Sequence, residues 1–155
     1  MSATVRPMTV EEFVVWRPQH EREYAENMID FGGIEPEAAH EKSKQDFVKL
    51  LGDGLDTPGS SLYVADDGGV AVGSIWLAER DDEQGTYLFV YDVNVDESER
   101  GRGLGRLLMV FAEEEARRRS IPRVILNVFG GNEIARNLYR SLRYDEMAVW
   151  MRKAV

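Results

Sequence analysis

The amino-acid sequence predicts one domain with a mixed α/β (α+β) fold, in which helices flank a central sheet. Three observations support this prediction. Helical patterns dominate up to Gly52, two apolar segments joined by a short turn follow, and strand and helix patterns then alternate. The chain has 155 residues and shows no repeat, linker or low-complexity tract. A core of that size buries roughly two-thirds of the unfolded chain's surface, so residues 1–155 are expected to form a single domain.

A candidate edge strand runs from Thr4 to Met8 and is followed by a helix. Thr9 and Glu12 have the spacing of a capping box, in which each side chain accepts a hydrogen bond from the backbone of the other residue. We expect this helix to end where Pro18 interrupts the apolar pattern.

Two more helical stretches are expected before the long strands. One carries Tyr24 and Ile29 on its apolar face and stops at Gly32-Gly33. The other begins near Pro36, because proline is favoured in the first turn of a helix, and it runs to Gly52.

The middle of the chain is expected to form a β-meander. The apolar segments Leu62–Ala65 and Val70–Leu77 flank Asp66–Gly69, whose composition is typical of a hairpin turn. Residues Asp81–Gly85 then turn the chain into Tyr87–Val95, which is rich in aromatic and β-branched residues and predicts a strand.

The segment Arg100–Arg106 predicts a phosphate-binding site. It connects the last of these strands to a helix expected from Leu104 to Arg119. Backbone N–H groups at a helix N-terminus attract phosphate, glycines allow a close approach, and three arginines add charge. Two other phosphate loops are excluded. Arg106 and Leu108 occupy the possible third-glycine positions of a dinucleotide fingerprint, and a P-loop would also need glycine at 106.

The remaining pattern predicts strand, helix and strand. Val124–Phe129 is a candidate buried strand, and Gly130-Gly131 turns the chain into a short helix, Asn132–Leu142. The last strand is expected at Met147–Lys153.

Two motifs resemble those of one enzyme family. Arg100, Gly103 and Gly105 form Arg-x-x-Gly-x-Gly, which resembles the acyl-coenzyme A pyrophosphate loop of the GCN5-related N-acetyltransferases. The later family signature, Asn-x-x-Ala-x-x-Leu-Tyr, is matched in the right order by Asn132, Ala135, Leu138 and Tyr139. One departure follows this helix, where the family usually has glycine and an aromatic residue and this chain has Arg143 and Tyr144.

The resemblance extends from about Leu62 to Lys153 and implies an acyl-CoA N-acyltransferase-like fold. In that fold the central sheet splays apart, and the backbone groups that lose their partners can bind the amides of the pantetheine arm. The cofactor-binding residues that the resemblance implies are Val93, Asn94, Val95, Arg100, Gly101, Arg102, Gly103, Leu104, Gly105, Arg106, Asn132, Ala135 and Tyr139. Asn132 can also act simply as the N-cap of its helix.

The activity implied by the resemblance is transfer of an acetyl group from acetyl-coenzyme A to a primary amine. The chain contains no cysteine, so direct attack without an acyl-cysteine intermediate is expected. Two alternatives remain open. One is a noncatalytic acyl-coenzyme A sensor on the same fold. The other is an arginine-glycine nucleic-acid binder, which a net charge of −9 disfavours.

Asp92 and Tyr139 are the candidate catalytic residues. A carboxylate inside an apolar strand is poorly explained by packing, and burial would raise its pKa toward that of a useful general base. Alternatives are a structural ion pair at Asp92, the weaker bases Glu97 and Glu99, or proton loss through water. Tyr139 is the expected general acid for the coenzyme A sulfur, and its alternative role is core packing.

The residues that could contact the acceptor amine are Tyr24, Trp76 and Asn127, each of which also has a purely structural interpretation. The acceptor itself stays open among metabolite amines, aminoglycosides, amino acids and protein amino groups. The acidic charge favours a cationic acceptor if it lines the cleft.

The two histidines, His20 and His40, lie among charged residues and are expected to be solvated. With no cysteine, a metal site is therefore not expected. No apolar run approaches the roughly 20 residues of a membrane span, and no signal peptide is evident, so a cytoplasmic protein is expected, as a monomer or homodimer.

Overall fold

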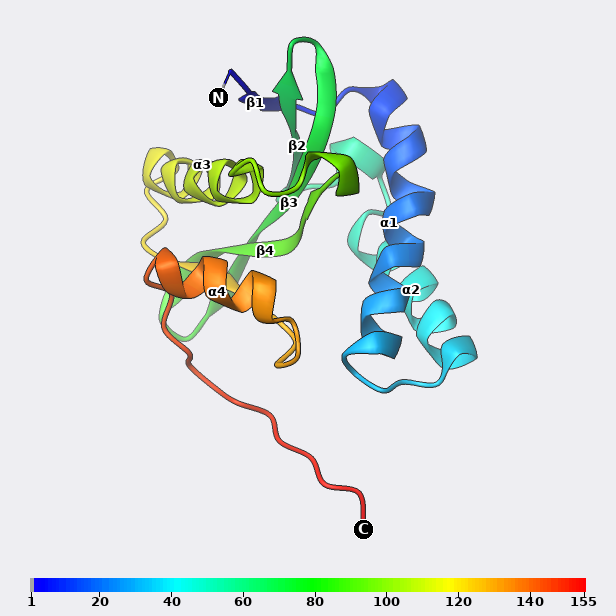
Figure 1. Cartoon of the computed structure of the whole chain (residues 1–155). Helices are drawn as coiled ribbons and strands as arrows, with labels where there is room; N and C mark the ends of the chain where they lie inside the picture. The colour runs from blue at the N-terminus through cyan, green and yellow to red at the C-terminus, as the bar shows by residue number, and fades with distance from the viewer. Residues whose placement is uncertain (1) are drawn as a thin grey trace.

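The computed structural model describes residues 2–155 and places a five-stranded sheet between two groups of helices (Figure 1). The strand order is β1-β2-β3-β4-β5, and all neighbours are antiparallel except β4 and β5. The strands are β1 (Thr4–Pro7), β2 (Ser60–Asp67), β3 (Val70–Asp82), β4 (Gly85–Val95) and β5 (Val124–Leu126). The main helices are α1 (Val10–Asp30), α2 (Pro36–Leu50), α3 (Leu104–Arg118) and α4 (Glu133–Ser141).

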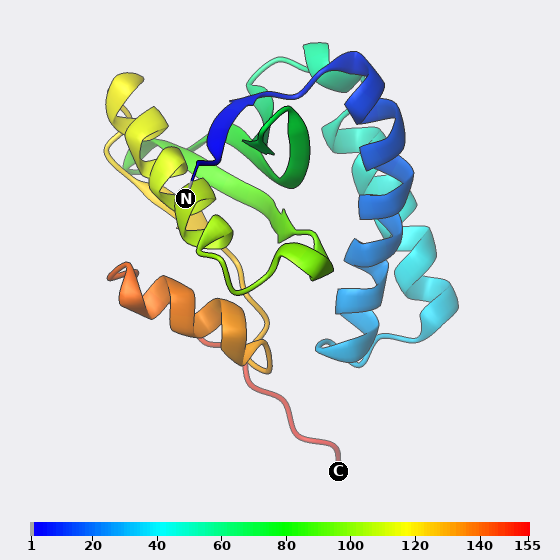
Figure 2. The ribbon, with the colours of Figure 1, turned by 45° about the horizontal axis from the view of Figure 1, so that its top comes forward.

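Helices α1 and α2 cover one face of the sheet, and α3 and α4 cover the other (Figure 2). Each interface has its own apolar core. The core beneath α1 and α2 contains the buried aromatic residues Trp16, Phe47 and Trp76. The core beneath α3 contains Leu104 and Leu108. Within residues 2–155, no helix is both long enough and apolar enough to cross a membrane.

Helix α1 is continuous, so the expectation that Pro18 would end it is wrong. The predicted capping box is present: the Glu12 N–H donates to Thr9 Oγ1 at 3.2 Å, and the Thr9 N–H donates to Glu12 Oε1 at 3.0 Å. Pro18 lies on the exposed side of the helix, one turn after Val14, which is also exposed. Water can hydrogen-bond the Val14 carbonyl that loses its helical partner there, so the helix tolerates the proline.

The predicted meander is confirmed, but the C-terminal strands differ from expectation. The strand expected at Val124–Phe129 pairs only over Val124–Leu126, opposite Leu88–Val90. The strand expected at Met147–Lys153 is absent, since residues 145–155 form an extended, exposed segment that leads away from the sheet (Figure 1). A strand requires a neighbouring edge to pair with, and β5 is only three residues long.

The sheet splays between β4 and β5, as the resemblance implied. The last paired residue of β4 on this side is Val90, yet β4 continues to Val95. A bulge precedes the unpaired part, because Trp76 pairs with Asp92 while the next β3 residue pairs with Val90, which leaves Tyr91 without an opposite residue. The bulge bends β4 at the point where the two parallel strands separate.

Helix α4 ends in a Schellman motif at the position where the sequence departs from the family. Arg143 has a φ of 67°, its N–H donates to the Arg140 carbonyl, and the Tyr144 N–H donates to the Tyr139 carbonyl. The expected left-handed residue is therefore confirmed. This motif also brings the rings of Tyr139 and Tyr144 to 5.9 Å between centroids.

Candidate active site

The loop before α3 exposes backbone donors at the N-terminus of the helix. Gly101 and Gly103 both have a φ of 81°, a conformation that favours glycine, and no side chain of residues 2–155 caps α3. The Leu107 N–H bonds the Gly103 carbonyl at 3.0 Å, and the N–H groups of the preceding turn have no helical carbonyl to reach. This geometry fits an anionic ligand.

The three arginines of the loop differ in their surroundings. Arg102 contacts the carboxylates of Asp67, at 2.8 Å, and Glu99. Arg100 donates only to the Val95 carbonyl, and Arg106 donates to Ser141 Oγ at 2.6 Å. Within residues 2–155, neither Arg100 nor Arg106 forms an ion pair, so these two positive charges are available to a phosphate.

Leu104 and Gly105 anchor the loop to the rest of the domain. The Leu104 side chain is buried in the core beneath α3. A Cβ on Gly105 would lie 3.3 Å from Leu138 Cδ2, so glycine here permits close packing of α3 against α4. This packing role was not evident from the sequence motif.

The unpaired end of β4 presents different side chains on its two faces. Val93 and Val95 pack against the core beneath α3. Asp92 and Asn94 face α1, where Asn94 Nδ2 donates to Glu23 Oε2 at 2.5 Å. Because no β5 residue pairs beyond Val90, the backbone of this segment is free on one side, and its amides fit the amides of a pantetheine arm.

Asn132 acts as the N-cap of α4, one of the two roles considered for it. Its Oδ1 accepts a hydrogen bond from the Ala135 N–H at 3.3 Å. Ala135 itself is half-buried and packs against the core beneath α3.

Tyr139 lies at the inner face of α4 and is 9% exposed. Burial, with a smaller contribution from the charge of Asp92, raises the pKa of Tyr139 to about 12. The hydroxyl is therefore protonated at neutral pH. The packing role considered for Tyr139 is confirmed, and its environment also keeps a proton available close to Asp92.

Asp92 has the most perturbed carboxyl group of the site. Burial raises the pKa of Asp92 from 3.8 to about 6, while His20 lowers it and Glu23 raises it to smaller extents. Its Oδ2 atom is buried and has no hydrogen-bond partner within residues 2–155. The weaker candidates differ, since Glu97 is exposed and Glu99 pairs with Arg102.

His20 is part of this site, so the expectation that it would be solvated is wrong. It is 8% exposed, stacks on Trp16 at 4.6 Å and 17°, and lies with its Nε2 3.7 Å from Asp92 Oδ2. The signal was present in the sequence, because His20 follows Trp16 at helical spacing on the same face. The assumed helix end at Pro18 concealed it. His40 is exposed, as expected.

The three candidate acceptor-contacting residues lie in different surroundings. Trp76 is buried opposite Asp92 and stacks on Tyr91 at 4.7 Å. Tyr24 packs between α1 and α2 against Phe47. Asn127 is exposed directly after β5. The structural interpretations of Trp76 and Tyr24 therefore hold, and only Trp76 adjoins Asp92 in the strand register.

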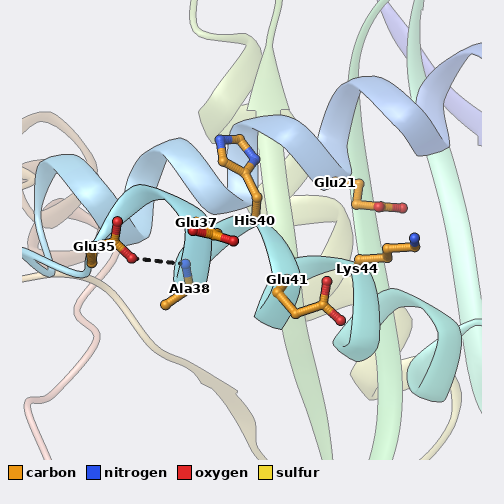
Figure 3. Close-up of a pocket in the computed structure, with 7 residues that line it drawn as sticks. All are labelled: Glu21, Glu35, Glu37, Ala38, His40, Glu41 and Lys44. Carbon is orange, nitrogen blue, oxygen red and sulfur yellow. Dashed lines mark hydrogen bonds between the residues drawn. The ribbon is translucent and has the colours of Figure 1, made fainter.

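A surface hollow of about 760 Å³ lies elsewhere, on the outer side of α1 and α2 (Figure 3). Its lining shares no residue with the site at β4. It is lined by Glu21, Glu35, Glu37, Ala38, His40, Glu41 and Lys44.

Comparison with known proteins decides the family. A sequence model described as the Acetyltransferase (GNAT) family matches residues 12–144. The chain belongs to the GNAT acetyltransferase family. Members of this family generally use acetyl-CoA as the cosubstrate. The expected fold class and family resemblance are thus confirmed.

Similar GNAT proteins cover almost the whole chain. The uncharacterized N-acetyltransferase YycN of Bacillus subtilis (strain 168) is 32% identical over 99% of both chains. YdgE of the same organism, also an uncharacterized N-acetyltransferase, is 30% identical over 99% of this chain and 98% of its own length. The crystal structure of YycN has a TM-score of 0.90 and covers 99% of this chain and 98% of that one. A GCN5-related N-acetyltransferase from Ralstonia eutropha JMP134, at 21% identity, shares the fold with a TM-score of 0.76.

Proposed function

We propose that this GNAT protein transfers an acetyl group from acetyl-CoA to a primary amine by direct attack. The observation that carries the proposal is that Asp92, a carboxyl with a pKa of about 6, lies close enough to the protonated Tyr139 for its charge to raise the pKa of Tyr139, at the point where β4 and β5 separate. A base that can be ionised at neutral pH and an acid that keeps its proton are the two groups that this transfer requires.

The chain offers separate elements to each part of acetyl-CoA. The free N–H groups before α3, together with Arg100 and Arg106, fit the pyrophosphate. The free backbone of residues 93–95 fits the pantetheine amides, and the family resemblance implies that Asn132, at the start of α4, holds the other side of the pantetheine arm. Acetyl-CoA supplies an activated thioester carbonyl, and a backbone N–H of the same β4 segment would stabilise its developing oxyanion.

The proposed roles of Asp92 and Tyr139 follow the protons. An alkylamine has a pKa near 10 and arrives as ammonium. Asp92 takes one proton from it, which gives the nitrogen the lone pair that attacks the acetyl carbonyl. As the carbon–sulfur bond breaks, Tyr139 protonates the sulfur, and the second proton released by the nitrogen restores the tyrosine hydroxyl.

The proposed acceptor is a cationic primary amine, small or part of a protein. Asp92 and Glu23 place two carboxyl groups beside the unpaired end of β4, and His20 is the only ion-pair partner that either of them has within residues 2–155. An ammonium group would therefore meet negative charge that no lysine or arginine neutralises.

A panel of primary amines with acetyl-CoA and a free-thiol readout tests the proposal. We expect turnover with at least one cationic amine and none with a neutral amide, whose nitrogen is not nucleophilic. If heat denaturation shows that acetyl-CoA stabilises the protein while no amine is acetylated, the noncatalytic sensor replaces the transferase. Absence of stabilisation would remove both.

A further inference from the structure

A buried imidazole lies between two carboxyl groups on the α1 side of the site. His20 Nε2 is 3.7 Å from Asp92 Oδ2, on β4, and 3.9 Å from Glu23 Oε2, one turn further along α1. Ser74 Oγ, on β3, lies 3.4 Å from the same nitrogen. Asn94 completes the surroundings by donating to Glu23 Oε2.

The hydrogen bonds determine which nitrogen of His20 can exchange a proton. Nδ1 lies 2.9 Å from the Trp16 carbonyl, which can only accept, so Nδ1 carries a hydrogen. Trp16 Nε1 in turn donates to Ser74 Oγ at 2.9 Å, which leaves the serine hydroxyl hydrogen free to point at Nε2. Nε2 is therefore the atom that holds a lone pair when the ring is neutral and a proton when it is charged.

The ring is held rigidly in this orientation. It stacks on Trp16, which itself contacts Phe47 and Trp76 in the core beneath α1 and α2. A second nitrogen cannot be presented to Asp92 without breaking the bond to the Trp16 carbonyl. Packing and hydrogen bonding thus aim Nε2 at the carboxyl groups.

We propose that His20 is a positioning residue that shares with Asp92 the proton taken from the acceptor amine. The inference rests on the proposed function. Asp92 Oδ2 removes a proton from the ammonium group, and that proton moves on to His20 Nε2. Asp92 is then an ionised carboxylate paired with an imidazolium, and no other bond has changed. Glu23, whose side chain is 31% exposed, lies on the other side of Nε2 and provides the way out to solvent.

Charge balance explains why this site needs the imidazole. Glu23 and Asp92 are both acidic, and Tyr139, which approaches Asp92 from α4, gains no charge at neutral pH. A proton that stayed on Asp92 would block the base for the next turnover. Transfer to His20 leaves an ion pair in a low-dielectric setting, where opposite charges stabilise each other most.

The pH dependence of kcat/KM distinguishes this arrangement from simple packing. In the wild type the acidic limb should follow Asp92, near pH 6. His20→Gln removes the ring that lowers the pKa of Asp92 and should move the limb up by roughly one pH unit, whereas Glu23→Gln removes a carboxylate that raises this pKa and should move the limb down. His40→Gln, on the exposed side of α2, is the matched control and should leave the profile unchanged. Limbs that stay in place in both site variants would overturn the proposal.

Nitrogen NMR tests the same inference without turnover. The chain has two histidines, so His40→Gln assigns the remaining ring to His20. We expect the neutral ring to carry its hydrogen on Nδ1, with Nε2 as the nitrogen that faces Asp92, and we expect Asp92→Asn to change the Nε2 signal. A neutral ring that carries its hydrogen on Nε2, or an Nε2 signal indifferent to Asp92, would overturn the proposal. Failure of every amine to react would instead count against the proposed function alone.

Discussion

At Tyr139, one hydroxyl distinguishes a catalytic role from a packing role. Tyr139→Phe keeps the ring in the core and its contact with Tyr144, so the melting temperature and acetyl-CoA affinity should change little. If the hydroxyl protonates the sulfur, turnover should fall by roughly 100-fold. Tyr144→Phe is the matched control, because the Tyr144 hydroxyl is also buried, has no hydrogen-bond partner within residues 2–155, and is not proposed to react. Equal rates in wild type and Tyr139→Phe would leave Tyr139 as a packing residue.

Asp92 is expected to lower the stability of the protein at the pH where it is active. The folded state raises the pKa of Asp92 from 3.8 to about 6, so it binds this proton more tightly than the unfolded state does. The resulting stabilisation is fully present below pH 3.8 and is lost as the pH rises through 6. Asp92→Asn, which cannot ionise, should therefore increase the free energy of unfolding by about 2 kcal/mol at pH 8 and by little at pH 4. Denaturant unfolding at both pH values measures this difference, and a stabilisation that is larger at pH 4 would contradict it.

The loop before α3 predicts a rank order of cofactor affinities. Gly103→Val should weaken acetyl-CoA binding most, because a β-branched residue is strained at a φ of 81° and would obstruct the approach of pyrophosphate. Arg100→Ala and Arg106→Ala should each weaken binding less, through lost charge. Arg102→Ala is the matched control and should have the smallest effect, because its guanidinium is already paired with Asp67 and Glu99. Calorimetry on folded variants gives the order, and unchanged affinity in Gly103→Val would exclude this loop.

The C-terminus of α4 predicts a stabilising substitution. Arg143 is exposed, has a φ of 67°, and makes no side-chain hydrogen bond or ion pair within residues 2–155. Arg143→Gly should therefore stabilise the protein by roughly 1 kcal/mol and leave turnover nearly unchanged. Ser120 ends α3 in the same conformation, with a φ of 57°, so Ser120→Gly is an independent comparison. A lower melting temperature for Arg143→Gly would contradict the strain argument, and weaker acetyl-CoA binding would reveal a phosphate contact.

At the scale of the whole molecule, the extended segment at residues 145–155 predicts self-association. It exposes Met147, Val149, Trp150 and Met151, and its Arg152 donates to the Gly32 carbonyl near the end of α1. Exposed apolar residues in an extended segment, together with the free edge of β5, favour pairing with another chain. We expect light scattering to show a dimer at high protein concentration, and a chain ending at Asp145 to remain monomeric. A monomeric full-length chain at every concentration would contradict this expectation.

Much of the candidate site could be predicted from the sequence because its signals are local. The phosphate loop from Arg100 to Arg106 is determined by glycine spacing between a strand and a helix, and the Thr9 capping box by a three-residue interval. The left-handed conformation at Arg143 followed from the end of the helical pattern. Each of these depends on neighbours within about one helical turn, which the order of residues specifies directly.

Tertiary structure alone decided the features that depend on distant contacts. Pro18 is tolerated because its side of α1 is exposed, and that continuity carries His20 into the core against β4. Asp67, at the end of β2 and 35 residues before Arg102, neutralises Arg102, whereas Arg100 has no ion-pair partner within residues 2–155. Residues 147–153 have the composition of a strand but do not form one, because they do not pair with the edge of the sheet. Helical spacing and turn chemistry are properties of short segments, whereas burial, ion pairing and strand pairing require a second segment whose position only the folded chain determines.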